Sequence, residues 1–221
     1  MYSVRVQGRG RRSRLLASAA VATMLLLTGC QGDPEPDAGG TTTVQGTPSE
    51  SPAAVATTKP PTPEPSPASS AGPAANIPVP EKPALADENS KEGLEAFTEY
   101  WFELFSYGYE TNDWTEFEAV TDPGCGTCGN VLIAVEEVYD ASGWIVGADS
   151  SLIDFTTDFQ INTQGSIRSF VEVVQGQIQT YSSDGMLEGD DPEKESRTSV
   201  TFAIHGKDGW RMLDFGSPEG S

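Results

Sequence analysis

Histidine and cysteine are scarce in this sequence. Among its 221 residues there is one histidine, His205, and there are three cysteines. A protein zinc site takes three or four ligands of these types, and nucleophilic catalysis commonly uses a histidine base. The sequence also lacks the GxxxxGK and HExxH patterns of phosphate and zinc sites. We therefore expect no metal, no cofactor and no Ser-His-Asp set, and we assign no catalytic residue.

Aromatic residues are nearly absent from the first third of the chain. The only one before Phe97 is Tyr2, whereas thirteen of the sixteen prolines lie at positions 34–83. Aromatic side chains supply much of the burial energy of a small core, and a Pro-, Thr- and Ser-rich segment cannot bury enough surface to fold. The composition predicts a disordered tether over residues 30–86 and a folded domain over residues 87–221.

Basic residues are also rare outside the first 14 positions. The chain has 13 Lys and Arg against 33 Asp and Glu, and five of its arginines precede residue 15. Removal of that segment leaves 8 basic residues against 33 acids, a net charge of −25. Nucleic-acid binding needs clustered Lys and Arg, so we expect no nucleic-acid partner.

The longest apolar run, residues 15–28, is too short to span a bilayer, which takes about 20 residues in a helix. Behind a basic segment it is typical of a signal peptide. It ends in Leu27-Thr28-Gly29-Cys30, which resembles the lipobox of bacterial lipoprotein precursors. That resemblance implies cleavage of residues 1–29 between Gly29 and Cys30, and attachment of palmitate-like acyl chains at Cys30. The expected location is the extracytoplasmic face of the cell membrane, in the cell envelope.

Helical periodicity dominates the first half of the folded region. Apolar residues recur at spacings of three and four from Leu94 to Phe105, with Ser90 as a suitable N-cap. Shorter helices are predicted at residues 114–120, where Asp113 and Glu116 are spaced as in a capping box, and at residues 128–140.

Beyond residue 143 the sequence is typical of strands. Segments rich in β-branched and aromatic residues are followed by turn residues, and Gly176 indicates a bulge. In the segment 198–205, Phe202 and Ile204 face one way and His205 the other, which suggests a solvated strand-end histidine. The predicted strands cover residues 144–146, 152–161, 167–181, 198–205 and 210–215. We predict an α+β domain in which N-terminal helices pack on a curved antiparallel sheet.

This element order is similar to the cone of the NTF2-like superfamily, and Gly209-Trp210 resembles the start of its closing strand. The local sequence is closer to a family of actinobacterial lipoproteins that carries domain of unknown function 6318. The resemblance covers roughly residues 80–150 and implies no activity and no catalytic residue. Its motifs are Gly93, Ala96-Phe97, Tyr100-Trp101, Tyr107, Thr111-Asn112-Asp113, Cys125-Gly-Thr-Cys128 and Gly143-Trp144 with Gly147.

Once Cys30 is lipidated, Cys125 and Cys128 remain as a pair in an oxidising compartment. We predict a structural disulfide between them. A redox-active CxxC and a metal site are the alternatives, but a thioredoxin-like pair follows a strand, whereas this pair follows a predicted helix.

Four strand carboxylates are candidates for a proton-transfer role: Asp154, Asp158, Glu172 and Asp214. Outward-facing carboxylates are the simpler interpretation on so acidic a protein. The acidic segment 184–195 lacks EF-hand spacing and is interpreted as a solvated hairpin loop. The leading hypothesis is a non-enzymatic domain that binds a small ligand or an envelope protein. The alternatives are an NTF2-like isomerase or hydrolase and a structural envelope module.

Overall fold

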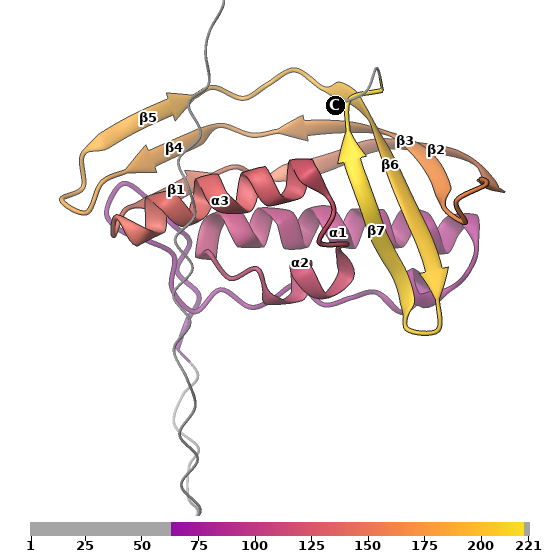
Figure 1. The fold of residues 1–221 in the computed structure, drawn as a ribbon. Coiled ribbons are helices and arrows are strands. Elements are labelled where there is room, and N and C mark those ends of the chain that lie inside the picture. The colour runs from indigo at the N-terminus through magenta and orange to yellow at the C-terminus, as the bar shows by residue number, and fades with distance from the viewer. Residues whose placement is uncertain (1–62, 219–221) are drawn as a thin grey trace, which may run out of the picture. The chain divides into compact units, whose positions relative to one another are not determined.

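A computed structural model of the chain describes residues 63–218, which form helices first and strands afterwards (Figure 1). A 3-10 turn, η1, precedes three α-helices. The helical elements are η1 Ala84–Asp87, α1 Lys91–Thr111, α2 Thr115–Val120 and α3 Gly126–Asp140. The strands are β1 Trp144–Gly147, β2 Ser150–Ile161, β3 Ile167–Gln175, β4 Ile178–Tyr181, β5 Leu187–Asp191, β6 Arg197–Gly206 and β7 Gly209–Gly216.

Helix α1 begins as the sequence predicts. The Ser90 hydroxyl accepts a hydrogen bond from the Gly93 amide at 3.0 Å, which caps the first turn. The helix continues to Thr111 and stops at Asn112, whose φ of 57° is left-handed. Asparagine tolerates this conformation better than most residues, so the Asn112 position ends the helix cleanly.

Helices α2 and α3 start at other residues than predicted. The Asp113 carboxylate accepts from the amide of Thr115 at 3.1 Å rather than from that of Glu116, so α2 begins one residue late. Helix α3 begins at Gly126, two residues early, because the Cys125 sulfur accepts from the Cys128 amide at 3.4 Å and caps the helix.

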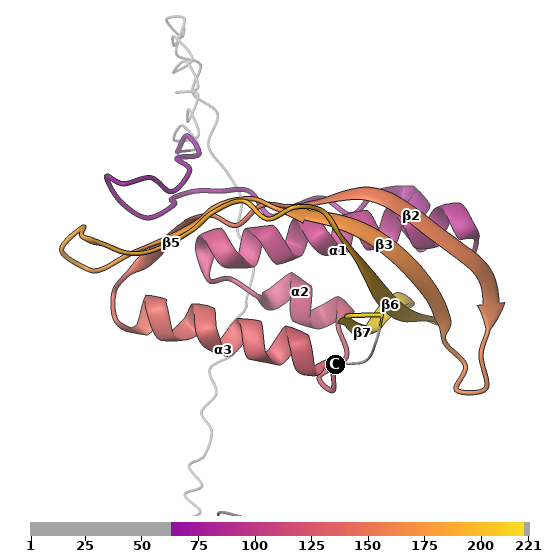
Figure 2. The ribbon, with the colours of Figure 1, turned by 90° about the horizontal axis from the view of Figure 1, so that it is seen from above.

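The seven strands form two antiparallel sheets, with the orders β1-β4-β5 and β2-β3-β6-β7. The predicted strand 167–181 is divided into β3 and β4, so Gly176 marks a break and not only a bulge. At this break the Gly176 amide donates to Asp149 O at 2.8 Å, and the Ala148 amide donates to Gln177 O at 2.8 Å. Figure 2 shows the resulting long, bent course of β2 and β3. The α+β class is confirmed, and neither sheet is closed.

Strand β6 presents its small residues to the core. Thr201 and Ala203 are each 1% exposed, whereas Val200, Phe202 and Ile204 are only half-buried. The large rings on the inner side come from the neighbouring strand, because Thr201 pairs with Phe215 and His205 pairs with Trp210. Small side chains on β6 therefore leave room for the rings of β7 and α1.

Trp101 lies at the centre of the hydrophobic core with no exposed surface. Its ring centroid lies 5.0 to 5.5 Å from those of four phenylalanines, Phe102, Phe105, Phe117 and Phe215. Its indole nitrogen donates to the Thr121 hydroxyl at 2.8 Å. One side chain of α1 thus contacts α2, the α2–α3 linker and β7.

The described part of the Pro-rich segment contacts the domain before η1. Residues 66–75 form a tight loop whose ends exchange backbone hydrogen bonds between Ser66 and Ala75, each 2.8 Å long. The indole nitrogen of Trp144 donates to Ser69 O at 2.8 Å, and the Ala68 amide donates to the Glu110 carboxylate at 2.9 Å. Contacts with the domain thus begin inside the segment that composition assigns to the tether.

A substitution at Gly108 tests the close packing of α1 against the start of α2, because a Cβ at this position would overlap the indole ring of Trp114. We expect Gly108→Ala to lower the free energy of unfolding by about 1–3 kcal/mol through overpacking. Gly129→Ala is the matched control, since a Cβ at this helical glycine meets nothing within 4 Å. It should raise stability by up to about 1 kcal/mol through helix propensity. Urea unfolding of both variants measures the difference, and equal effects would contradict the packing described.

Candidate functional site

An apolar groove of about 370 Å³ runs between α3 and the sheet β1-β4-β5. We call it the α3 groove. One wall is the inner side of α3, and the other combines Ile145 of β1 with Ile178 and Thr180 of β4. The remaining lining residues are Tyr109, Thr127, Asn130, Val131, Ala134, Val135 and Val138. Asn130 and Ala134 are exposed, so the groove opens to solvent along α3.

Among the residues that the structure describes, Tyr109 is the single titratable one that lines the α3 groove. Burial raises the pKa of its hydroxyl, and a hydrogen bond with the side chain of Gln175 partly offsets this effect. Its neighbour Tyr139 holds the end of α1, since its hydroxyl lies 2.6 Å from Glu110 O and 3.0 Å from Tyr109 O. The groove therefore offers neutral hydrogen-bonding groups on an apolar wall.

The two cysteines of the CxxC motif open helix α3. Their sulfur atoms lie at bonding distance, with the Cα atoms 5.3 Å apart. Helix α2 precedes the pair, as the sequence predicts, but Cys125 is also the N-cap of α3. Cys125 and Cys128 are 2% and 4% exposed, so the sulfurs are shielded from an approaching thiol. A neighbouring hollow of about 300 Å³ is lined by both cysteines, Leu132 and Arg211, among others.

His205 lies at the end of β6, as predicted, but on the inner face beside η1. Its ring contacts that of Trp210 edge-on at 4.8 Å, and its Nε2 lies 3.1 Å from Asp87 O. The neighbouring Trp210 indole donates to Glu88 O at 2.8 Å. His205 is half-buried and lies away from the α3 groove, so its role is to hold η1 to the sheet.

The four candidate carboxylates do not meet in one site, and none of them lines the α3 groove. Asp154 and Asp158 are exposed on β2. Glu172 accepts a hydrogen bond from Ser196, and Asp214 accepts one from the Phe215 amide at 3.0 Å. Asp214 instead lines a hollow of about 210 Å³ on the outer face of the sheet β2-β3-β6-β7.

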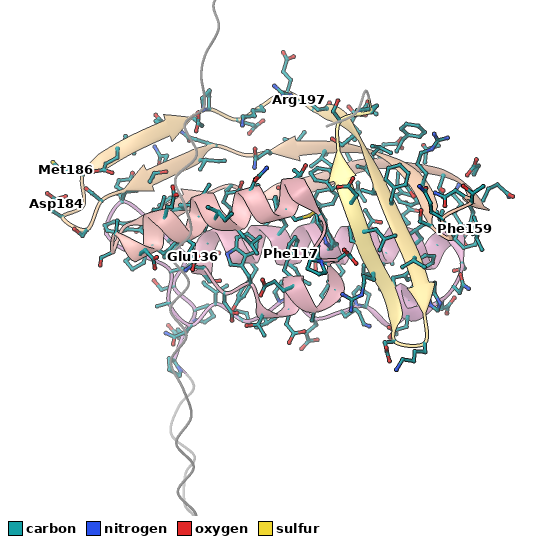
Figure 3. All side chains as sticks on the ribbon, viewed as in Figure 1. Phe117, Glu136, Phe159, Asp184, Met186 and Arg197 are labelled. Carbon is teal, nitrogen blue, oxygen red and sulfur yellow. A yellow bond between two sulfur atoms is a disulfide. The ribbon has the colours of Figure 1, made fainter. Side chains whose placement is uncertain are left out.

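The sequence predicts a solvated loop over the acidic segment 184–195, and this prediction is wrong for its middle part. Leu187–Asp191 forms β5 and pairs antiparallel with β4, where the Gln177 side chain donates to Asp190 at 2.6 Å. Gly189 pairs with Thr180 across the two strands. Figure 3 shows Asp184 and Met186 at the tip of this hairpin, away from the helices. Among the residues described, no group of three or more acidic, His or Cys side chains is placed to hold a metal ion.

The residues that carry the predicted lipid anchor, Gly29 and Cys30, lie outside the described residues. The predictions for the signal peptide, the cleavage site and most of the tether likewise concern positions before residue 63. Within residues 63–218, no helix has both the length and the apolar character needed to cross a membrane.

No sequence pattern points directly to the α3 groove. Its residues Val131, Val135 and Val138 look like an ordinary buried face of α3, and Ile178 lies in a segment whose pattern predicts one continuous strand. The groove exists because the break after Gln175 starts β4 as a separate strand of the sheet β1-β4-β5. Gly176 is the one feature of the sequence that indicates this division of the strand.

The structure thus defines an α+β domain with a filled aromatic core and an apolar side groove. The chain matches the family of unknown function DUF6318 over residues 63–215, and it belongs to this family. The match includes the described part of the Pro-rich segment. No curated protein matches the sequence.

Two solved structures resemble the domain at low similarity. The intermembrane space region of the chloroplast protein ARC6 shares 13% identity at a TM-score of 0.38, covering 57% of this chain and 95% of that chain. Aln2 from a Streptomyces species shares 10% identity at a TM-score of 0.35, covering 55% of this chain and 88% of that chain. At these TM-scores neither protein informs on the function of this one.

We predict that Cys125 and Cys128 are bonded to each other in protein taken from cells and that the bond resists reductant until the domain unfolds. The intact mass of the protein should rise by the mass of two hydrogen atoms only when the reduction is carried out in denaturant. The double substitution Cys125→Ser, Cys128→Ser should lower the free energy of unfolding by only about 2 kcal/mol, because a disulfide that closes a short loop removes little entropy from the unfolded chain. Thiol labelling of the native protein without prior reduction would show the pair to be free.

Alkaline pH should unfold the domain through its buried tyrosines. Burial raises the pKa of Tyr139 from 10.0 to about 12, so the folded state favours the protonated hydroxyl. The resulting stabilisation is complete below the unfolded pKa of 10.0 and is lost as pH rises toward 12. Tyr139→Phe removes this dependence, so its unfolding midpoint should fall less steeply over that range. Tyrosinate absorbance provides the check, with the urea-unfolded protein as the reference for normal titration.

Proposed function

We propose that the protein is a lipid-anchored extracytoplasmic binding protein whose domain holds a small, uncharged and largely apolar ligand in the α3 groove. One observation carries this proposal: the groove is large enough for a ligand and is lined by apolar and neutral hydrogen-bonding side chains. Binding pockets for small molecules typically measure about 300–1,000 Å³ and combine an apolar wall with a few polar groups.

The charge of the protein supports a neutral ligand. Within residues 63–218, no Asp, Glu, Lys, Arg or His lines the groove, so an ion entering it would lose hydration without gaining a counter-charge from them. The rest of the mature chain is strongly acidic and repels anions. Tyr109, Asn130 and Thr180 offer hydrogen bonds to one or two polar groups on an otherwise apolar molecule.

An NTF2-like enzyme that uses a strand carboxylate is the weaker alternative. Such an enzyme needs a carboxylate in an apolar site, where burial raises its pKa into the working range. Asp154 and Asp158 face solvent, and Asp214 lies on the outer face of the sheet instead of in the groove. A purely structural envelope module would bind nothing in the groove, so a test of ligand binding distinguishes it.

We infer that the two sheets and the helices correspond to an opened NTF2-like cone with its helices packed on the curved sheet. The course of the chain supports this inference. Two residues separate β1 from β2, and two residues separate β3 from β4. Because β1 pairs with β4 and β2 pairs with β3, the two breaks lie side by side and both chain segments bend at the same place. The interior of such a cone would be occupied by Trp101 and its aromatic neighbours, which leaves the α3 groove as the available site.

Filling the groove should abolish binding without disturbing the fold. We expect the uncharged fluorescent probe N-phenyl-1-naphthylamine to bind the wild-type protein and to brighten. Ala134→Trp places an indole in the groove from its exposed rim and should eliminate this signal. Ala119→Trp is the matched control, since Ala119 is an exposed helical alanine that does not line the groove. Equal binding by both variants would refute the groove as the site.

The anchor is tested separately from the ligand. Cys30→Ala removes the acceptor of the lipid and should move the protein from the membrane fraction to the medium, or leave an uncleaved precursor. Mass spectrometry of the N-terminal peptide of the wild-type protein should show acyl chains on Cys30. An unmodified cysteine in that peptide would overturn the proposed anchor.

A further inference from the structure

The outer face of β6 and its neighbours is unusually apolar. An antiparallel sheet with one face in water normally carries polar residues on that face. Here the outward residues at the centre of the sheet β2-β3-β6-β7 are Phe170 of β3 with Val200, Phe202 and Ile204 of β6. We call these four residues the outer patch.

The outer patch lies open in the described part of the chain. Phe170 is 37% exposed, and the other three members are half-buried. No helix crosses this face of β6 in Figures 1 and 2, where β6 and β7 pass in front of α1 and α3 lies beside β7. A hollow of about 210 Å³ lies over Phe170, Val200 and Phe202, and residues 216–218 at the end of the described chain form its remaining wall.

Opposite charges flank the outer patch on its two sides. Arg168 of β3 pairs in register with Phe202, and Phe202 pairs with Asp214 of β7, so the three lie in one row across the sheet. Both charged residues line the hollow, and the Arg168 guanidinium lies 5.0 Å from the centre of the Phe170 ring. Strands are about 4.8 Å apart, which sets Arg168 and Asp214 roughly 10 Å apart. The salt bridges found among the described residues do not include this pair.

We propose that the outer patch binds the same patch of a second copy of this chain, on a two-fold axis parallel to β6. Rotation about that axis exchanges the β3 and β7 sides, so Arg168 of each copy faces Asp214 of the other while Phe202 packs against its counterpart. A two-fold axis perpendicular to the strands would set Arg168 against Arg168. Charge therefore selects one arrangement of a self-complementary interface.

The row of Arg168, Phe202 and Asp214 also favours a second copy of the chain, rather than an unrelated protein, as the partner. A basic or acidic partner would satisfy only one of the two flanking charges, whereas a copy satisfies both and covers the apolar centre. The mature net charge of −25 opposes association of two copies. The contact is accordingly weak and depends on the Arg168–Asp214 pairs, which makes it sensitive to reversal of either charge. This inference is independent of the ligand proposed for the α3 groove.

The experiment uses the full chain in intact cells, with Phe202→Cys as a reporter at the two-fold axis. Mild oxidation should give a disulfide-linked dimer, and Lys207→Cys, at a 90% exposed site in the β6–β7 turn, should give none. Added to the reporter, Arg168→Asp or Asp214→Arg should each reduce the dimer about tenfold, since like charges then face each other twice. Lys207→Asp makes the same charge change as Arg168→Asp and should have no effect.

Restoration by the double reversal is the decisive result. Arg168→Asp combined with Asp214→Arg re-forms both pairs with opposite polarity and should return the dimer to within about twofold of the reporter alone. Three results would overturn the proposal: no dimer through position 202, a dimer unaffected by either single reversal, or a cross-link from position 202 only to a different envelope protein. The last would identify the outer patch as a site for another partner.

Discussion

The fold depends on the position of Trp101. This side chain is fully buried in α1 and touches rings from α2 and β7, while its nitrogen is satisfied by the hydroxyl of Thr121. A buried indole N–H without a partner would cost about as much as a lost hydrogen bond, so the α2–α3 linker must pass where Thr121 can reach it. That linker in turn bridges to Met212 of β7 and delivers the disulfide to the start of α3.

Much of the fold could be predicted because its elements have local causes. The apolar period of α1 and the cap at Ser90 act within a few residues, and the structure has both. The orientation of β6 could not be predicted in the same way. Which of its faces is buried depends on the rings that β7 and α1 place opposite Thr201 and Ala203, and those contacts are distant in sequence.

The candidate site could not be predicted from the sequence for a related reason. Its walls come from α1, α3, β1 and β4, and no motif marks their meeting. Residues with recognisable chemistry were easier to find but serve the architecture: His205 holds η1, and the Cys125–Cys128 pair shapes the start of α3. In this protein the hydrogen-bonded polar residues stabilise the fold, and the surfaces proposed to bind a ligand or a second copy are apolar.

The contacts of residues 66–75 have a mechanical consequence. A pull on the chain from before residue 63 acts first on the Trp144–Ser69 and Glu110–Ala68 hydrogen bonds, which hold a small loop of the chain against the domain. Release of that loop lengthens the chain while η1 remains fixed through Trp210 and Glu88. Along the chain, these contacts lie before η1 and α1, so tension from that end would reach them before it reached the core of the domain.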